Sequence, residues 1–598
     1  MSEPIKIIKN ILDLDMIFSF EVEPKNPNDY IVNFEVKQLS QRRKILIPYI
    51  VRKDGSAFNI KDFSLKLDIP LMDIHGVSMP GKCDNLYLSR IPWQIDEKIS
   101  SHNNFPFLSF INRKGMNKLA LGIKDPKIGY QIKGRLDEKR ECEFKLEVNT
   151  ISNIYCKSFQ SQIFFSREEI FWFELTKIYS EWTETERKDI PLFAYEPVFC
   201  TWYAVHQDLH QDWIEKTSLE AYKLGYRILI VDDGWFTPDI ERGYWFTGDW
   251  EICDTIFKNF KKHVKRVQDI GMKYILWIAP FMIGKSSKAY RKFKNLLVAP
   301  TESFANLCPQ SKLTREHILE VVADLYTRYN LDGFKFDFID HLPAEPCLEN
   351  NHDHFCEKSG EGIEIILEEV TKRLYKLGNN IPLIEFRQRY ATPVMRRYST
   401  AFRALDTPLD FDTNRRRIIN LRSFAGRFPV YSDPIFWHKG ESLSNIALHF
   451  INCIFSVPML SIDLLRLNDD ERQVIKFWTN FFSENRYLLL FGKFVPIFTG
   501  GDFSEAYSIE NGRGILALYN NNSYYIERKL LCKNLKELFI LNGSNREGIS
   551  LYGEELTGNW LIEVKDLQGY TVKKFERTLN GFLSMSVKIG GLIYLLRE

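Results

Sequence analysis

The chain has 598 residues, of which 44% are hydrophobic and 26% charged, and its 80 Lys and Arg against 78 Asp and Glu give a formal net charge of +2. This balance is typical of a globular protein and excludes a disordered chain. The small net charge argues against a nucleic-acid-binding protein, and no apolar run approaches the roughly 20 residues that a membrane helix needs. We therefore expect neither nucleic acid nor a membrane as a partner.

The start of the chain and its cysteine content indicate the compartment. Glu3 and Asp13 interrupt the first apolar stretch, which is unlike a secretory signal. Ten cysteines in 598 residues are too few for a disulfide scaffold. We expect a cytoplasmic protein.

Residues 1–185 contain short segments in which apolar and polar residues alternate, bounded by Pro, Gly, Asn and Asp. Examples are Asp29–Val36, Lys44–Val51 and Cys142–Val148. Such segments predict antiparallel strands with one buried face. We expect an N-terminal β-sandwich domain over residues 1–185.

Residues 186–490 alternate between strand-like and helix-like segments. Two helices are predicted over Thr314–Tyr329 and Gly360–Leu377. Eight strands alternating with helices over this length predict an α/β fold, a (β/α)8 TIM barrel. The eight predicted strands are Phe199–Val205, Arg227–Asp232, Tyr274–Pro280, Gly333–Ile339, Pro382–Arg387, Ala401–Leu405, Phe428–Asp433 and Pro458–Leu464.

The last part of the chain returns to short strands. After a predicted helix over Asp470–Leu490, strand-like runs include Ile515–Tyr519, Ser523–Ile526 and Leu592–Leu596. This pattern predicts a small antiparallel C-terminal β-sandwich domain over residues 491–598.

Polar residues at the carboxyl ends of barrel strands are the candidates for chemistry, because reactive groups of such barrels stand there. The fourth strand carries Lys335 and Asp337 on one face, so Lys335 would keep Asp337 ionised. Several carboxylates, two cations and aromatic rings at one mouth favour glycoside hydrolysis, which needs an ionised and a protonated carboxyl. The other candidates are Trp202, Asp232, Asp233, Trp235, Arg403, Asp406 and Asp433.

Five motifs in order resemble the α-galactosidases of glycoside hydrolase family 36, in the clan shared with family 27. They are Thr201-Trp202-Tyr203, Val231-Asp232-Asp233-Gly234-Trp235, Gly248-Asp249-Trp250, Gly333-Phe-Lys335-Phe-Asp337-Phe and Phe402-Arg403-Ala-Leu-Asp406-Thr407. The similarity extends over roughly residues 197–464.

The resemblance implies a retaining double displacement on a terminal α-galactoside of a small oligosaccharide. Asp337 maps onto the nucleophile and Asp406 onto the acid/base. The resemblance also implies no metal or organic cofactor. In the substrate site it implies that Asp232 and Asp233 bind the 4- and 6-hydroxyls, Lys335 the 3- or 4-hydroxyl and Arg403 the 2-hydroxyl, with Trp202 and Trp250 as apolar walls. Further candidates for substrate binding are Trp235, Asp249 and Arg387.

Two departures from the family pattern leave alternatives open. After the fifth strand, Glu385, Arg387 and Arg389 share one face, where an arginine could bind an anionic substituent or simply pair with Glu385 inside the barrel. Near the acid/base, Asp410 or Asp412 could replace Asp406.

A loop after the fourth strand carries His341, Cys347, His352, His354 and Cys356. Cys and His can bind zinc, but this Cys-x4-His-x-His-x-Cys spacing is not that of a recognised finger. We expect no metal and interpret the loop as part of the cleft rim, although metal binding stays open.

Other functions compete with this interpretation. The same fold could serve an α-galactosyltransferase or an α-N-acetylgalactosaminidase, and a catalytically silent carbohydrate-binding protein is the alternative from another class. The expected partner is a carbohydrate substrate, and assembly into a homo-oligomer stays open.

Overall fold

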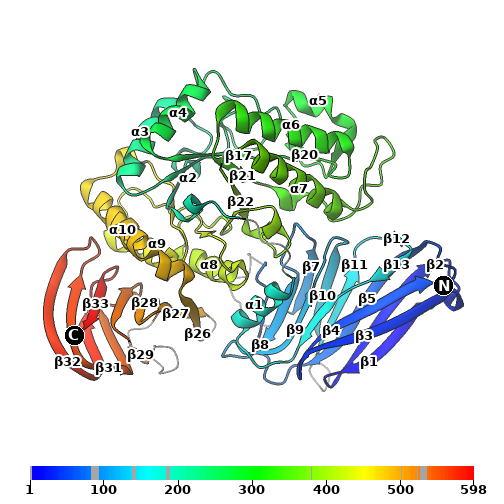
Figure 1. The fold of residues 1–598 in the computed structure, drawn as a ribbon, viewed down its shortest axis with the longest axis horizontal. Helices are drawn as coiled ribbons and strands as arrows, with labels where there is room; N and C mark the ends of the chain where they lie inside the picture. Colours follow the sequence, from blue (N-terminus) through cyan, green and yellow to red (C-terminus); the bar gives the residue numbers. More distant parts are fainter. Residues whose placement is uncertain are drawn as a thin grey trace.

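The structure, a computed structural model, describes residues 3–81, 93–137, 143–183, 189–378, 380–499, 502–520, 523–525 and 535–598. Three parts follow one another along the chain (Figure 1). Two N-terminal β-sheets, in blue and cyan, and a C-terminal sheet, in red and orange, lie on opposite sides below a green and yellow barrel. Within the described residues, no helix has the length and apolar content required to cross a bilayer.

The described N-terminal strands form two sheets. One has the order β1-β2-β5-β11-β10-β7, with β12 on β5, and the other has the order β13-β4-β14-β9-β8-β6, with β3 on β4. Alternating side chains of both sheets form one apolar core, which includes Phe18, Leu65 and Phe110. The strands are β1 Ile5–Ile11, β2 Leu14–Glu23, β3 Tyr30–Ser40, β4 Arg43–Arg52, β5 Phe58–Pro70, β6 Gly76–Ser78, β7 Gln94–Ile99, β8 Phe107–Ile111, β9 Asn117–Ile123, β10 Tyr130–Asp137, β11 Glu143–Thr150, β12 Ile154–Cys156, β13 Ser158–Gln160 and β14 Ile163–Ser166.

The middle of the chain is a parallel barrel, as predicted. Its eight strands follow the order β24-β23-β22-β21-β17-β16-β15-β25, and parallel bridges Tyr431–Val457 and Ile435–Leu460 join the two ends. The strands are β15 Val198–Cys200, β16 Ile228–Val231, β17 Lys273–Ile278, β21 Gly333–Phe336, β22 Leu383–Arg387, β23 Ala401–Arg403, β24 Val430–Tyr431 and β25 Met459–Leu460.

Helices surround this barrel (Figure 1). Between β17 and α6, a small sheet of order β18-β20-β19 extends one loop. The elements are α1 Trp172–Thr183, α2 Trp202–Val205, α3 Gln211–Lys223, α4 Phe260–Ile270, β18 Met282–Gly284, α5 Lys288–Lys292, β19 Leu297–Val298, β20 Phe304–Leu307, α6 Lys312–Tyr329, α7 Ser359–Leu377, α8 Phe411–Ala425, α9 Leu443–Cys453 and α10 Asp469–Phe491.

All eight predicted strands exist, but most are shorter than expected. The first ends at Cys200, and the residues predicted as its second half, Trp202–Val205, form the helical turn α2. The apolar run continues through both elements, and its pattern does not distinguish a strand from a helical turn. The end of the strand is therefore visible only in the structure, where Val198–Cys200 are buried in the sheet.

The C-terminal strands form one sheet, of order β26-β27-β28-β30-β33-β31-β29 with β32 on β31, among the described residues. The expected C-terminal β domain is present and most of its described strand pairs are antiparallel, but β28 pairs with β30, and β29 with β31, in parallel. Alternation reveals a buried face but not the direction of the neighbouring strand. The strands are β26 Lys493–Thr499, β27 Asp502–Glu510, β28 Arg513–Leu518, β29 Ser523–Tyr525, β30 Glu537–Asn542, β31 Gly548–Lys565, β32 Thr571–Ser586 and β33 Leu592–Arg597.

One apolar core joins the barrel to its neighbours. It includes Trp172 of α1, Trp478 of α10 and Phe503 of β27 as well as the barrel interior. The predicted boundary at residues 185–186 and the strand residues Cys142 and Ile526 lie outside the described residues. The predicted boundary at residues 490–491 coincides with the end of α10.

Candidate active site

A cavity of about 140 Å³ opens at the carboxyl ends of the barrel strands. The side chains around it belong to or follow seven of the eight barrel strands, all except β25, and most are charged or aromatic. Of the eleven predicted site residues, Trp202, Asp232, Asp233, Lys335, Asp337, Arg387, Arg403 and Asp406 meet here. The cavity is lined by Trp202, Asp232, Asp233, Arg242, Tyr244, Trp277, Lys335, Asp337, Phe338, Arg387, Arg403, Asp406, Asp433 and Pro434.

Asp337 follows β21 directly and is 7% exposed. Its carboxylate accepts hydrogen bonds from Trp277 Nε1 at 3.1 Å and from the Phe338 backbone N–H at 2.8 Å. Phe338 adopts a left-handed conformation with φ 59°, a local strain of the kind that accumulates at functional sites. Burial alone would raise the pKa of Asp337, but the cations Arg387, Lys335 and Arg403 hold it well below its usual range. Asp337 is therefore an anion in a nearly dry setting.

The cation nearest to Asp337 is Arg387, not Lys335. Arg387 Nε lies 3.4 Å from Asp337 Oδ1, whereas Lys335 Nζ donates to Asp232 Oδ2 at 2.6 Å. The sequence-based expectation that Lys335 keeps Asp337 ionised therefore holds only as a secondary effect, because the ammonium points across the barrel to the second strand.

The segment Asp232-Asp233-Gly234 turns sharply after β16. Gly234 has φ +111°, and a Cβ there would lie 2.7 Å from Gln207 Cα, so only glycine suits this position. Gln207 Nε2 donates to Asp233 Oδ2 at 2.6 Å, while Asp233 Oδ1 is buried without a hydrogen-bond partner. Burial and the neighbouring Asp232 raise the pKa of Asp233 to about 8. Asp233 thus presents a protonated carboxyl with a free oxygen at the cavity.

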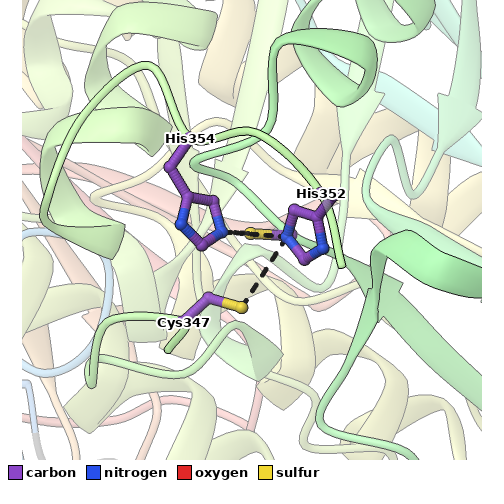
Figure 2. A group of neighbouring side chains, drawn as sticks. Cys347, His352 and His354 are labelled. Carbon is purple, nitrogen blue, oxygen red and sulfur yellow. Dashed lines mark hydrogen bonds between the residues drawn. The ribbon is translucent and has the colours of Figure 1, made fainter. Parts of the chain in front are cut away.

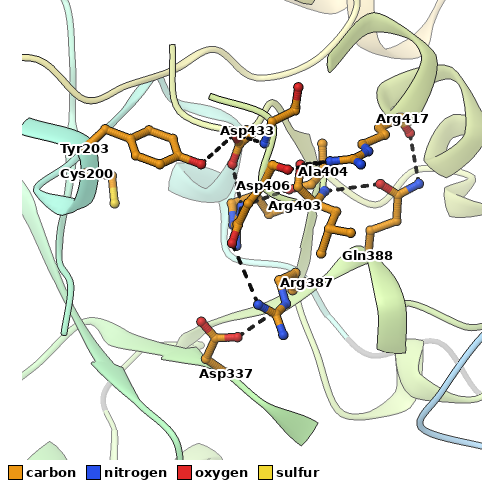
Figure 3. A network of polar contacts seen from close by, with 12 residues as sticks. Cys200, Tyr203, Asp337, Arg387, Gln388, Arg403, Ala404, Asp406, Arg417 and Asp433 are labelled. Atoms are coloured by element: carbon orange, nitrogen blue, oxygen red, sulfur yellow. Dashed lines mark hydrogen bonds and ion pairs between the residues drawn. The ribbon is translucent and has the colours of Figure 1, made fainter. Parts of the chain in front are cut away.

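Arg403 contacts three carboxyl groups, of which Figure 3 shows Asp406 and Asp433. Its Nε donates to Glu385 Oε1 at 3.0 Å, and its Nη1 lies 2.6 Å from Asp433 Oδ1 and 2.9 Å from Asp406 Oδ1. Burial raises the pKa of Asp433 to about 7 and also raises the pKa of Glu385, despite the opposing charge of Arg403. Asp433 additionally accepts from Tyr203 Oη at 3.0 Å. Protein groups therefore engage Arg403 through both its Nε and its Nη1.

Asp406 stands at the rim, with 45% of its side chain exposed. Burial would raise its pKa, but Arg403 and then Arg387 lower it, while the Asp337 charge acts in the opposite direction. The acid of a glycoside hydrolase must start protonated, which a drier or more carboxylate-rich setting would favour. In this structure the site's cations make Asp406 an anion instead.

Asp410 and Asp412 do not reach the cavity. Asp410 accepts from the Thr413 backbone N–H at 3.0 Å and caps α8, and Asp412 pairs with Arg415 at 2.6 Å. Of the three aspartates in this segment, only Asp406 lines the cavity.

Arg387 lies between carboxylates rather than beside Glu385. Its Nη2 is 2.9 Å from Asp340 Oδ1 and its Nη1 is 3.9 Å from Asp406 Oδ2, and Figure 3 shows the guanidinium between Asp337 and Asp406. The simple Glu385–Arg387 pair that the strand alternation allowed is thus wrong, since Glu385 pairs with Arg403. Arg389 is not among the cavity-lining residues.

Three predicted substrate contacts do not line the cavity: Trp235, Asp249 and Trp250. Asp249 accepts from the backbone N–H groups of Lys288 and Ala289, at 3.0 and 2.8 Å, and so holds the start of α5. Trp235 stacks on Trp250 at 6.0 Å and donates to the carbonyl of Trp277 at 2.9 Å. A motif gives the order of residues but not the direction of their side chains, and here both rings support the wall behind Trp277.

The sequence analysis missed Arg242, Tyr244, Trp277, Phe338 and Pro434, which line the cavity. Arg242 lies over the Trp202 ring at 5.2 Å. Arg242 and Tyr244 belong to the long loop between β16 and α4, where no periodicity marks which side chains turn inward. Trp277 and Phe338 could have been found, because they belong to or follow predicted barrel strands.

Comparison with known proteins supports the family resemblance. The family model for melibiases matches residues 178–343. An α-galactosidase, AgaA, of Geobacillus stearothermophilus is 24% identical over 340 residues, which are 51% of this chain and 43% of that protein. An A type blood α-D-galactosamine galactosaminidase of Flavonifractor plautii is 24% identical over 242 residues, 36% of this chain and 21% of the relative. The chain thus aligns with less than half of the length of these relatives.

The fold agrees over a longer stretch. A solved structure of AgaA, a family 36 α-galactosidase, in complex with 1-deoxygalactonojirimycin has a TM-score of 0.62 at 15% identity, covering 100% of this chain and 85% of that one. Another, in complex with raffinose, has a TM-score of 0.61 at 14% identity over 100% and 85% of the two chains. The predicted fold is confirmed, and the chain is similar in sequence and fold to α-galactosidases of family 36.

Proposed function

We propose that this protein is a retaining glycoside hydrolase that removes terminal α-linked galactose from small oligosaccharides. The observation that carries the proposal is Arg387, which contacts Asp337 and Asp406 at the same cavity at the strand ends. The similarity to family 36 α-galactosidases points to the same chemistry.

Asp337 is the proposed nucleophile. Its oxygens are held by Trp277 and by the Phe338 backbone, and its low pKa keeps it ionised. Attack on the anomeric carbon would form the Asp337–sugar ester bond and break the bond to the departing oxygen.

Asp406 is the proposed acid/base. It would give its proton to the departing oxygen and, in the second step, take a proton from the attacking water. The charge of Asp337 opposes the cations and so favours proton uptake by Asp406, although the cations hold the pKa of Asp406 below its usual value. Ester formation removes that charge, which lowers the pKa again and suits Asp406 to act as the base.

Asp232, Asp233 and Lys335 are the proposed recognition groups for the sugar. Asp233 Oδ1 is buried without a partner, an arrangement that is costly until a ligand hydroxyl bonds to it. Trp202 and Trp277 offer apolar faces for the sugar ring. Arg403, bound to three carboxyls, is better suited to orient Asp406 than to contact the 2-hydroxyl.

The test is hydrolysis of a panel of nitrophenyl α-glycosides by the wild type and by Asp337→Ala with and without azide. We expect release from the α-galactoside, its loss in the variant, and rescue by azide as the β-galactosyl azide. The proposal would be refuted if the folded wild type hydrolysed no glycoside of the panel. It would also be refuted if Asp337→Ala without azide were as active as the wild type.

A second candidate is hydrolysis of an α-galactosaminide, favoured by the similarity to the α-D-galactosamine galactosaminidase of F. plautii. Preference for a 2-amino or 2-acetamido substrate over the α-galactoside in the same panel would keep the proposed mechanism but change the proposed sugar.

A further inference from the structure

Four cysteine and histidine side chains outside the cavity meet at one point. The ligand atoms of Cys308, Cys347, His352 and His354 all lie within 4.8 Å of one another. Figure 2 shows Cys347, His352 and His354 turned toward a common centre. Cys308, which follows β20, completes the group and was missed in the sequence because it precedes the loop. Cys308 is buried and the other three are half-buried.

The distances suit a tetrahedron around a metal ion. Cys308 Sγ lies 3.6 Å from His354 Nε2, and Cys347 Sγ lies 3.7 Å from His352 Nε2. With Zn–S near 2.3 Å and Zn–N near 2.0 Å, tetrahedral coordination separates a sulfur from a nitrogen by about 3.5 Å. The two Nε2 atoms are 2.9 Å apart, about 0.4 Å closer than that geometry requires. A small rotation of one half-buried ring would correct this.

The histidine tautomer also suits a metal. His352 Nδ1 lies 2.7 Å from Asn351 Oδ1, an acceptor that requires the proton on Nδ1. The Nε2 atom then carries a lone pair directed at His354 and Cys347. An outer acceptor that orients the ring in this way is the usual partner of a metal-bound histidine.

The surrounding backbone already brings the two ligand segments together. Ser311, just before α6, forms a β-bridge with His354. Gln310 Oε1 accepts from the Cys347 backbone N–H at 2.6 Å, and Gln310 Nε2 donates to the Cys356 carbonyl at 3.1 Å. Cys356 itself turns to the Lys358 carbonyl and His341 packs on Phe304, so neither is a ligand.

We propose that Cys308, Cys347, His352 and His354 bind one zinc ion in a closed, four-ligand structural site. Two thiolates and two neutral imidazoles are the ligand set that zinc prefers in such sites. Binding replaces the two thiol protons, which pass to solvent, by two Zn–S bonds, and the resulting centre has no net charge. The ion fixes the loop between Asp337 and α7 to the loop before α6, and thereby the rim of the cavity.

The test is the metal content of the full-length protein, purified under reducing conditions without chelator or metal-affinity resin. We expect one zinc per chain in the wild type, lost in Cys308→Ser and in His354→Ala. Cys356→Ser, a cysteine of the same loop outside the four, is the matched control and should keep its zinc. The proposal would be overturned if Cys356→Ser lost as much zinc as Cys308→Ser and His354→Ala.

A measurement on the wild type avoids any folding defect of the variants. After removal of zinc with a chelator, Co²⁺ should bind in a one-to-one ratio. It should give the visible bands of a tetrahedral site and a near-ultraviolet charge-transfer band from two thiolates. Failure to bind Zn²⁺ or Co²⁺ with reduced thiols, or an octahedral cobalt spectrum, would refute the site, whatever the hydrolytic activity.

Discussion

Arg387 lies 3.4 Å from Asp337 and, through a different nitrogen of the same guanidinium, 3.9 Å from Asp406. One planar cation therefore lowers the pKa of both proposed catalytic carboxylates, as the main cation at Asp337 and after Arg403 at Asp406. Because the guanidinium cannot lose its proton, it holds Asp337 ionised at every working pH.

Arg387→Met should move the acid limb of the pH profile of kcat/KM to higher pH. The substitution removes the main cation that lowers the pKa of Asp337, so that carboxyl takes up a proton at a higher pH than in the wild type. We expect a loss of about 10² to 10³ in kcat/KM at neutral pH. Arg387→Lys keeps the charge, so the acid limb of its pH profile should lie close to that of the wild type. If the acid limb of Arg387→Met is also unchanged, Arg387 does not control the ionisation of Asp337.

Asp406→Ala should slow the enzyme in a way that depends on the leaving group. A poor leaving group needs the proton from Asp406, so the rate for such substrates should fall by about 10² to 10⁴. For a nitrophenyl galactoside, whose leaving group needs no proton, formation of the glycosyl-enzyme should slow by less. Azide should restore turnover and give the α-galactosyl azide, the anomer opposite to that from Asp337→Ala. Asp410→Ala is the control, because it removes a cap of α8, worth about 1 kcal/mol of stability, and should show no leaving-group dependence.

Asp233→Asn should remove an alkaline limb from the pH profile of kcat/KM. The raised pKa of about 8 means that Asp233 is protonated at neutral pH and ionises as the pH rises through that value. Ionisation removes a donor and adds a charge beside Asp232, so galactoside binding should weaken above pH 8 in the wild type. An amide keeps the donor at every pH; a persisting limb in Asp233→Asn would assign the titration to another group.

Glu505→Gln should stabilise the protein at pH 8 but not at pH 4. Burial raises the pKa of Glu505, a residue of β27, to about 7. The folded state therefore binds this proton more tightly than the unfolded state, and the stability it contributes is lost as the pH rises through 7. We expect a gain on the order of 1 kcal/mol at pH 8, measured by thermal unfolding. Glu576→Gln, on the exposed face of β32, should change little at either pH.

The barrel and the proposed catalytic pair could be predicted from the sequence for different reasons. Strands such as Ile228–Val231 are wholly buried apolar runs, and their ends mark the barrel mouth. Asp337 and Asp406 were found because motifs kept their order along those ends.

Side-chain direction in loops could not be predicted in the same way. Asp249 and Trp250 lie in a loop where Trp250 has φ 54°, and this backbone turns the ring onto Trp235 instead of the cavity. Cys308 lies before α6 and its partners lie after β21, so only the folded chain brings them together. Arg387 was predicted, but its position between two carboxylates depends on the register of β22 against β21 and β23.

The cavity of about 140 Å³ is well below the 300–1,000 Å³ common for drug-sized ligands. It ends in the buried groups Lys335, Asp232 and Asp233, so a sugar that enters can have no further residue on its far side. A cavity closed in this way would accept only the terminal residue of an oligosaccharide. During digestion of a longer substrate, free monosaccharide should accumulate from the first minutes, with no internal fragments.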